Sequence, residues 1–484
     1  MNVGRWLRDR ARITPRRTAI VFGDVRIGYG ELDERSERLA AGLLAAGAAP
    51  GDRVASLTGN SPEHVELLFA CAKAGLILVP LNVRLTAAEL SFQLEDAEPA
   101  MFFASPALRG LAERSASGPR PAELSRRGFD ALAATVGGVL PEADADAGLL
   151  LVYTSGTTGR PKGALLTHAN CFWTNLSFDR GCELREDDVV LQVLPQFHVG
   201  GWNVQPLLAW WKGATVVLEP AFDAGRALRR IAECRVTTMM GVPATYQFMA
   251  GHPAFSEIDL SHLRTVVVGG APMPEPLLHR WHDRGVRIVQ GYGLTEAAPN
   301  VLCLPPEEAA ARIGWVGRPY PHVDVALLGV RGPGRGELLV RGPNVFAGYW
   351  RDPEATEAAF VDGWLRTGDI AERDADDCYR IVGRVKDMYV SGGENVYPAE
   401  VESVIAAFPG VAEVAVVGVP DERWGEVGCA FVAGAGVDET ALLAHCRERL
   451  AAYKVPRHVE MVPALPRSAV GKIVKNDLRS RFHG

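Results

Sequence analysis

The chain has 484 residues, of which 48% are hydrophobic and 23% charged, and its 51 basic and 58 acidic side chains give a formal charge of −7. This length predicts at least two folded units, with enough apolar material for a sizeable core. The acidic balance argues against a large nucleic-acid-binding surface, because such surfaces normally carry a basic excess.

The sequence shows no sign of a membrane span or a secretory signal. Residues 1–10 lack the apolar core of a signal peptide, and no apolar run approaches the roughly 18 residues that cross a bilayer. The eight cysteines form no CxxC pair and no metal-ligand spacing, which predicts reduced, packed thiols. We therefore expect a cytoplasmic enzyme, a monomer or a homodimer, with no nucleic-acid partner and no transmembrane segment.

Helices and strands alternate along the first three quarters of the chain. A helix is predicted over 31–47, where leucines recur on one face, and Ser61 followed by Pro62 predicts the start of the next. Residues 105–145, rich in Ala, Arg, Pro and Ser, are typical of a variable surface connection or a joint between subdomains. Short apolar runs that end in Gly- or Pro-rich loops predict buried strands over 147–153, 265–268, 286–290 and 337–341.

The pattern changes near residue 385, where a strand over 379–382 gives way to a short charged joint over 384–387. The elements predicted beyond it are helix 398–408, strands 413–418 and 429–433, helix 438–450 and a basic tail. We predict an α/β protein with two domains. A large N-terminal domain of several subdomains, its sheets layered with helices, covers 1–385, and a small mobile α+β domain covers 386–484.

Residues 153–163, with the sequence YTSGTTGRPKG, carry the strongest chemical signal. Glycines let backbone N–H groups approach phosphate oxygens, hydroxyls add hydrogen bonds, and Lys162 supplies positive charge. Lysine is scarce, with seven among the 51 basic residues, which favours a specific use for this ammonium group. A Walker A loop would need Gly in place of Pro161 and Ser or Thr in place of Gly163. The alternative is an ordinary Ser/Thr/Gly turn, and we favour a phosphate loop.

Two weaker signals lie farther along the chain. Residues 290–296, QGYGLTE, place Tyr292 between glycines, where its ring can lie against a base, and Glu296 beside a hydroxyl, where it can reach a divalent cation. Residues 364–369, WLRTGD, end in Asp369, a carboxylate suited to paired ribose hydroxyls. Each signal alone is weak, because Gly-Tyr-Gly occurs in many loops and a solvated Asp is common in turns.

Together, and in this order, these segments resemble the adenylate-forming superfamily of acyl-CoA synthetases, aryl-CoA ligases, luciferases and peptide-synthetase adenylation domains. The resemblance covers nearly the whole chain and looks closest to bacterial fatty acyl-CoA synthetases and their aryl-acid relatives. It also rests on the sequences GEL at 336–338, GYW at 348–350, GRVKD at 383–387, SGGENVYP at 391–398 and PRSAVGK at 466–472.

The resemblance implies an AMP-forming acid–thiol ligase that uses ATP, Mg²⁺ and CoA. Its catalytic residues would be Lys472, Glu296, Thr154 and Lys162, with Glu296 as the Mg²⁺ ligand and Lys472 between the substrate carboxylate and the α-phosphate. Tyr292 would lie against adenine. The residues that the resemblance places around ATP or AMP are Thr154, Ser155, Gly156, Thr157, Thr158, Gly159, Lys162, Gly270, Ala271, Gly291, Tyr292, Gly293, Thr295, Asp369 and Arg384.

Within this set, Thr295 would contact the α-phosphate, Asp369 would bind the ribose hydroxyls, and Arg384 would lie near the nucleotide. Lys386 stands at the hinge position of the family. The hairpin that lines the path of the CoA pantetheine matches Gly392 and Gly393.

The chemistry explains why such a protein needs a mobile domain. A carboxylate that attacks the α-phosphate brings two anions together, so Lys472 and Mg²⁺ would offset their repulsion in the transition state. In the second step a CoA thiolate attacks the acyl carbon and AMP leaves, and Lys472 must move away to admit the thiol. One hinge that serves two active-site states meets this need. The alternative for Lys472 is one more charge on a basic tail.

The acyl pocket is implied at residues 194–202, LPQFHVGGW. In amino-acid-activating domains an Asp commonly follows the Phe and pairs with the substrate ammonium; here His198 follows it, which favours an uncharged, apolar acid. A packed core imidazole is the alternative for His198. Gly200 and Gly201 could leave space for a bulky acyl group, whereas Trp202 could shorten it, and the sequence leaves both open. The implied pocket residues are His198, Val199, Gly200, Gly201, Trp202 and Gly269.

Two positions depart from the family pattern. Asp377 and Cys378 stand where Gly and an aromatic residue usually precede the hinge, and Trp315 stands where Ser is common. The first departure could alter how the C-terminal domain pivots, and the second could reshape a wall near the nucleotide or the acyl tunnel. Three alternatives stay open: an enzyme that runs mainly one half-reaction, acyl loading of a carrier protein, and a nucleotide-binding regulatory protein that kept the fold.

Overall fold

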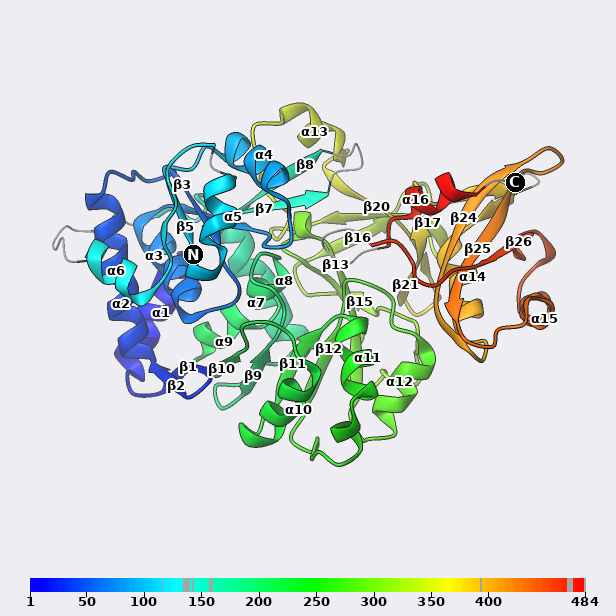
Figure 1. The fold of residues 1–484 in the computed structure, drawn as a ribbon, viewed down its shortest axis with the longest axis horizontal. Helices are drawn as coiled ribbons and strands as arrows, with labels where there is room; N and C mark the ends of the chain where they lie inside the picture. Colours follow the sequence, from blue (N-terminus) through cyan, green and yellow to red (C-terminus); the bar gives the residue numbers. More distant parts are fainter. Residues whose placement is uncertain are drawn as a thin grey trace.

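The computed structural model describes residues 1–115, 117–133, 140–141, 143–155, 160–391, 394–467 and 473–482. Two large sheets, a smaller third sheet and a C-terminal sheet organise these residues (Figure 1). The C-terminal sheet lies at one end of the molecule, and the helices that follow the N-terminus lie at the other.

The first sheet is mainly parallel, with antiparallel strands at both edges. Its strands, from edge to edge, are β15 (Arg318–Pro319), β14 (Asn300–Cys303), β13 (Ile288–Gly293), β12 (Thr265–Val268), β11 (Thr238–Gly241), β9 (Val189–Gln192), β10 (Thr215–Leu218), β1 (Thr18–Phe22) and β2 (Val25–Gly28).

The second sheet has a parallel part and an antiparallel edge. Its strands, from edge to edge, are β18 (Gly348–Tyr349), β8 (Pro161–Thr167), β7 (Gly148–Ser155), β4 (Ile77–Leu81), β3 (Arg53–Leu57), β5 (Met101–Ala104) and β6 (Ala122–Glu123).

Helices form a layer between the two large sheets and cover the outer face of each. One buried cluster joins strands of both sheets to the central helices α1 (Val3–Ile13), α2 (Tyr29–Ala45), α3 (Pro62–Ala74), α7 (His168–Cys182) and α9 (Pro206–Lys212). The outer helices are α10 (Ala224–Glu233), α11 (Pro243–Gly251) and α12 (Glu275–His282) on the first sheet, and α4 (Ala87–Ala97) and α5 (Arg109–Arg114) on the second. Shorter helices are α6 (Arg126–Ala133), α8 (Gly200–Asn203), α13 (Pro353–Ala358), and the 3-10 turns η1 (Pro106–Leu108), η2 (Pro253–Ser256), η3 (Thr295–Ala297) and η4 (Ala452–Lys454).

The early helices follow their sequence signals. The Ser61 side chain accepts a hydrogen bond from the His64 backbone N–H at 3.1 Å, Pro62 opens α3, and Gly75 ends it with φ 71°. The helix predicted over 31–47 is α2, shifted by two residues. The prediction of a surface connection over 105–145 is wrong in part. β6 extends the second sheet beside β5, and Phe129 of α6 is fully buried, so this segment contributes to the core.

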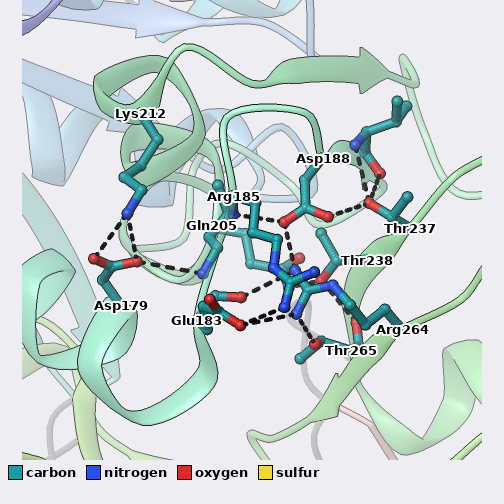
Figure 2. Close-up of polar contacts among 12 residues, drawn as sticks. Asp179, Glu183, Arg185, Asp188, Gln205, Lys212, Thr237, Thr238, Arg264 and Thr265 are labelled. Atoms are coloured by element: carbon teal, nitrogen blue, oxygen red, sulfur yellow. Dashed lines mark hydrogen bonds and ion pairs between the residues drawn. The ribbon is translucent and has the colours of Figure 1, made fainter.

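A polar network joins three strands of the first sheet at their amino ends (Figure 2). Asp188, Thr237 and Arg264 directly precede β9, β11 and β12. Asp188 is 3% exposed, and its carboxylate accepts hydrogen bonds from Thr237 Oγ1 at 2.6 Å and Arg264 Nη2 at 2.6 Å. A buried carboxylate needs such partners. These bonds tie together the amino edge of the sheet. The ligands of α/β sheets usually bind at the opposite, carboxyl edge.

A third sheet precedes the C-terminal segment, which has its own sheet and its own buried clusters. The third sheet contains β16 (Asp324–Leu327), β17 (Gly334–Arg341), β20 (Trp364–Arg373) and β19 (Phe360–Val361), with β21 (Tyr379–Arg384) beside β20. The C-terminal segment contains β22 (Tyr389–Ser391), β23 (Glu394–Val396), β24 (Val411–Asp421), β25 (Gly425–Gly434), β26 (His458–Met461), α14 (Pro398–Ala406), α15 (Glu439–Arg449) and α16 (Lys475–Arg481). The predicted α/β class and the α+β C-terminal set are confirmed, and the boundary at 385/386 stays a prediction.

The eight cysteines are free thiols, and seven of them are buried. In the part of the chain that the structure describes, no helix is long and apolar enough to cross a membrane.

Candidate active site

The predicted phosphate loop connects two paired strands of the second sheet. β7 and β8 are antiparallel, and their register sets Thr154 opposite Lys162. The backbone of the two strands therefore holds this hydroxyl and this ammonium group at the two ends of the loop. The loop residues Gly156, Thr157, Thr158 and Gly159 lie outside the described residues, as does the side chain of Ser155.

Glu296, on the turn η3, meets these strands from the other large sheet. Thr154 Oγ1 donates a long hydrogen bond of 3.4 Å to Glu296 Oε1, and Tyr349 Oη donates one of 2.9 Å to the same oxygen. Lys162 Nζ lies 5.1 Å from the centroid of the Tyr349 ring, within cation–π range. Burial raises the pKa of Tyr349, so its hydroxyl stays a donor. The structure thus brings together the predicted Thr154, Lys162 and Glu296, and it adds Tyr349, to which the sequence motifs assign no role.

Tyr292, Asp369 and Arg384 form a second group beside the first. Tyr292 Oη donates to Asp369 Oδ2 at 2.6 Å, and Arg384 Nε donates to Asp369 Oδ1 at 3.0 Å. Burial, followed by the charge of Asp369, raises the pKa of Tyr292. Asp369 is 7% exposed, and each of its oxygens has a further lone pair for a hydroxyl of a ligand. Tyr292 and Glu296 belong to the same short segment, 290–296, so the group around Asp369 and the group around Glu296 lie next to each other.

The backbone of this segment requires glycine at one position. A Cβ on Gly293 would lie 1.8 Å from the carbonyl oxygen of Pro299, so only glycine permits this approach. Gly291 pairs with Cys303 of β14, and Thr295 opens η3. At the carboxyl end of the neighbouring β12, Gly269 is buried, and Gly270 and Ala271 are exposed. These are loops at the carboxyl edge of the first sheet, and the residues predicted from the resemblance to surround the nucleotide include them.

The segment after β9, at the same edge of the sheet, agrees with the implied acyl pocket at some positions and differs from it at others. His198 is partly exposed, and its ring centroid lies 4.6 Å from that of Phe197. The expectation that Gly201 leaves space is wrong, because a Cβ there would lie 2.3 Å from the backbone oxygen of Pro195. Gly200, in contrast, is partly exposed, and a Cβ there would meet nothing closer than 3.6 Å.

Two further residues of this segment, Val199 and Trp202, are buried. Trp202 is fully buried, with its ring 5.0 Å from that of His64 and nearly perpendicular to it at 77°. The structure thus packs Trp202 against α3, on the side of the segment that faces the core.

The two glycines make a matched pair for a stability measurement. We expect Gly201→Ala to lower the free energy of unfolding by about 1–3 kcal/mol, because its Cβ overlaps backbone that cannot move aside cheaply. Gly200→Ala, in the same short helix, should change this free energy by less than about 1 kcal/mol, the usual effect of replacing Gly by Ala within a helix. Urea unfolding of both variants checks this, and equal losses would contradict the assignment.

The residues that the resemblance assigns to domain movement and to the second step lie in the C-terminal third. Lys386 is exposed in the turn after β21, which is held by the hydrogen bond from the Val385 N–H to Gly368 O at 2.9 Å. Gly392, Gly393 and Lys472 lie outside the described residues, so their placement stays a prediction. The described neighbours of Lys472 are Arg467 and Ile473, which form an isolated bridge.

Both departures from the family pattern have a local explanation. Asp377 has φ 56°, the left-handed conformation that suits the usual Gly and that Asp tolerates better than most residues. Two guanidinium groups lie over the Trp315 ring, with Arg312 Cζ 5.8 Å and Arg380 Cζ 5.3 Å from its centroid. Its carbonyl accepts a hydrogen bond from Gln290 Nε2 at 3.4 Å, so this substitution sits beside the strand that carries Tyr292.

Comparison with known proteins identifies the fold and the group of enzymes. The AMP-binding enzyme profile matches residues 7–350, and the profile of the AMP-binding enzyme C-terminal domain matches residues 400–472. The chain belongs to the AMP-binding enzyme family. It is 45% identical over 497 residues to a feruloyl-CoA synthase of an Amycolatopsis species, with 99% of each chain covered. It is 40% identical over 496 residues to the long-chain-fatty-acid–CoA ligase FadD13 of Mycobacterium tuberculosis, covering 99% of this chain and 98% of the relative.

A solved structure gives the same result. The O-succinylbenzoate coenzyme A synthetase of Bacillus subtilis, solved in complex with ATP and magnesium ion, is 32% identical and has a TM-score of 0.88, with 98% of each chain covered. The adenylate-forming resemblance is therefore confirmed. The named relatives are CoA ligases, which supports acyl- or aryl-CoA synthetase activity for this chain, as an AMP-forming acid–CoA ligase that uses ATP and CoA.

Proposed function

We propose that this chain activates a hydrophobic carboxylic acid as an acyl-adenylate and then transfers the acyl group to CoA. One observation carries the proposal: Thr154, Lys162 and Glu296 meet at one end of the segment that presents Tyr292 to Asp369 at the other. Phosphate chemistry needs cations and hydroxyls at one end of a nucleotide, and ribose needs a carboxylate at the other.

In the first step the chain positions two anions for attack. Lys162 and Thr154 hold the β- and γ-phosphates, Thr295 contacts the α-phosphate, and Lys472 brings the substrate carboxylate to it. A carboxylate oxygen bonds to the α-phosphorus, the bond from that phosphorus to the pyrophosphate oxygen breaks, and pyrophosphate leaves. Asp369 and Arg384 keep the ribose in place while this occurs. The protein forms no covalent bond to the substrates in this step, so the rate enhancement comes from positioning and charge stabilisation.

The Glu296 carboxylate fits a magnesium ion bound together with ATP. Both of its described hydrogen bonds reach Oε1, which leaves Oε2 for a cation. Among the described residues no group of three or more His, Cys, Asp or Glu side chains gathers to hold a metal. One carboxylate plus phosphate oxygens is the usual way in which Mg²⁺ binds at such sites. When bound, the ion would neutralise charge on the phosphates, and Glu296 is the residue that would hold it.

In the second step the C-terminal domain, which we place at residues 386–484, turns about Lys386. A CoA thiolate reaches the acyl carbon along the path that we assign to Gly392 and Gly393, and the bond from this carbon to the AMP oxygen breaks. Lys472 moves out of the site, which gives room for the thiol. Alternation of one domain between two arrangements lets a single crevice serve both reactions.

The acid is proposed to be apolar and without an ammonium group. His198 stands where an amino-acid-activating site would carry an Asp, and Gly200, with space for a Cβ, is the glycine of this segment that can border an acyl group. The named relatives act on feruloyl and long-chain fatty acyl groups, which are both largely apolar. Burying an ammonium group in this pocket without a carboxylate partner would be costly.

A pyrophosphate-exchange screen tests the proposal. The purified full chain is incubated with ATP, labelled pyrophosphate and one acid at a time: ferulic acid, indole-3-acetic acid, palmitic acid, and the matched pair 3-phenylpropionic acid and L-phenylalanine. We expect exchange with at least one acid that lacks an ammonium group, no exchange with L-phenylalanine, and an acyl-CoA detected by mass spectrometry when CoA is added. Exchange that prefers L-phenylalanine to 3-phenylpropionic acid would contradict the proposed acid class.

A further inference from the structure

Tyr349 lies on a two-residue strand that is fixed directly to the phosphate-loop hairpin. β18 pairs with β8, setting Tyr349 opposite Ala164, and the Trp350 N–H donates to Gly163 O at 2.7 Å. These partners directly follow Lys162 in the sequence. The ring is further packed by Phe346, whose centroid lies 4.9 Å away, at an interplanar angle of 76°.

The hydroxyl of this tyrosine sets the rotation of the Glu296 carboxylate. Tyr349 Oη and Thr154 Oγ1 both donate to Oε1, at 2.9 and 3.4 Å. The same segment also binds the Glu296 backbone, since the Phe346 N–H donates to Glu296 O at 2.9 Å. A hydroxyl that binds one carboxylate oxygen holds the other in a defined direction, which is the usual way in which metal-binding carboxylates are oriented.

The face of the Tyr349 ring contacts the positively charged Lys162. Lys162 Nζ lies 5.1 Å from the ring centroid, and among the described residues the side-chain hydrogen bonds of Glu296 come from Tyr349 and Thr154, with no ion pair to Lys162. A direct ion pair between them would neutralise the two groups that ATP and its cation require. Tyr349 offers each a neutral partner instead, the π face for the ammonium and the hydroxyl for the carboxylate.

We propose that Tyr349 is a positioning residue of the ATP–Mg²⁺ site, which keeps Lys162 and Glu296 close together but unpaired, with the ammonium group free for phosphate and Glu296 Oε2 free for the cation. This proposal rests on the function proposed above and adds a residue to it. Tyr349 acts through Lys162 and Glu296 and does not itself touch the reacting atoms.

Two substitutions separate the two contacts. Tyr349→Phe keeps the ring face and its packing and removes only the hydroxyl. Tyr349→Leu removes both. Tyr153→Phe is the matched control, because Tyr153 lies on β7, on the other side of β8 from β18, and its hydroxyl donates to Asp96 at 2.6 Å, away from Glu296. Thermal unfolding of each variant shows that it folds before binding is compared.

The main readout is binding of Mn²⁺, used in place of Mg²⁺, to the enzyme with ATP, measured by electron paramagnetic resonance. We expect Tyr349→Phe to weaken Mn²⁺ binding about ten-fold, as loss of a residue that orients a metal ligand commonly does. ATP affinity in the presence of EDTA should stay within about two-fold of wild type, because the ring face is kept. Tyr349→Leu should weaken Mn²⁺ binding likewise and weaken metal-free ATP binding about two- to five-fold as well.

The outcomes distinguish failure of the role proposed for Tyr349 from failure of the proposed function. A folded Tyr349→Phe variant that binds Mn²⁺ as tightly as wild type overturns the role of Tyr349, whatever its activity. Equal effects of Tyr349→Phe and Tyr153→Phe also overturn it, because they would report a general loss of packing. If the wild-type chain binds neither ATP nor Mn²⁺ with ATP, the proposed function itself fails, and this proposal fails with it.

Discussion

Lys472→Ala is expected to slow acyl-adenylate formation by about 10²–10³-fold, the usual effect of removing one group that stabilises charge in a transition state. The same variant should convert a preformed acyl-adenylate and CoA to acyl-CoA at a rate within about three-fold of wild type, because the lysine is then out of the site. The split follows from the proposed alternation: the ammonium group offsets repulsion between two anions in the first step and has no partner in the second.

The two half-reactions are measured separately, by pyrophosphate exchange and by acyl-CoA release from synthetic acyl-adenylate. Lys475→Ala is the matched control from the same tail, since Lys475 pairs with Glu402 at 2.6 Å within the C-terminal segment. Both side chains are about one-fifth exposed, and the pair lies outside the proposed site, so the loss of this ion pair should leave both rates within about two-fold. Equal losses in both half-reactions of Lys472→Ala would contradict the proposed alternation.

Much of the fold follows from local sequence signals. Thr265–Val268 is a run of β-branched residues closed by two glycines, and β12 has the predicted bounds. Ser61 and Pro62 begin α3 as expected, because capping depends on adjacent residues. β24 extends beyond its prediction to Asp421, through Pro420. Among the described strands it pairs with β25 alone, at the edge of the sheet, and an edge strand tolerates a proline that an internal strand would exclude.

Elements that depend on distant partners were not predictable in this way. β18 has two residues and no periodicity, and it exists because it pairs with β8, about 180 positions earlier in the chain. β6 and α6 were missed for the same reason, since burial of Phe129 depends on its contact with Phe103, whose ring centroid lies 5.7 Å away. Their sequence is short and rich in Ala and Arg, so no apolar pattern marks them.

The candidate site shows the same division. The motifs predicted the residues Thr154, Lys162, Glu296, Tyr292 and Asp369, and the fold brings them into two adjoining groups. The role of Tyr349 was not visible, although the GYW sequence at 348–350 belonged to the resemblance. Tyr349 and Glu296 are 53 residues apart in the sequence. A motif records residue types and does not show which distant residue each one contacts. Geometry therefore adds to the site what the motifs leave out: which charged groups face each other and what keeps them apart.

Glu296→Gln is expected to lower kcat/KM for adenylation by about 10²–10³-fold and to raise the Mg²⁺ concentration needed for half-maximal rate. Glutamine has nearly the same shape, and its Oε1 can still accept from Tyr349 and Thr154, so the change removes the negative charge and little else. Pyrophosphate exchange across a range of Mg²⁺ concentrations measures both effects. Glu98→Gln, which alters an exposed pair with Arg351 at 2.6 Å, is the control and should stay within about two-fold.

The second half-reaction decides whether Glu296 acts through the cation or through the fold. Once pyrophosphate has left, the β- and γ-phosphates are gone and only the α-phosphate stays in the acyl-adenylate. Glu296→Gln should therefore release acyl-CoA from preformed acyl-adenylate within about three-fold of wild type. A loss in this step as large as in adenylation would show that Glu296 supports the structure of the crevice, and it would remove the cation from our account of this residue. Because Oε1 already has two hydroxyl donors and Oε2 has none among the described residues, we expect the effect to fall on adenylation.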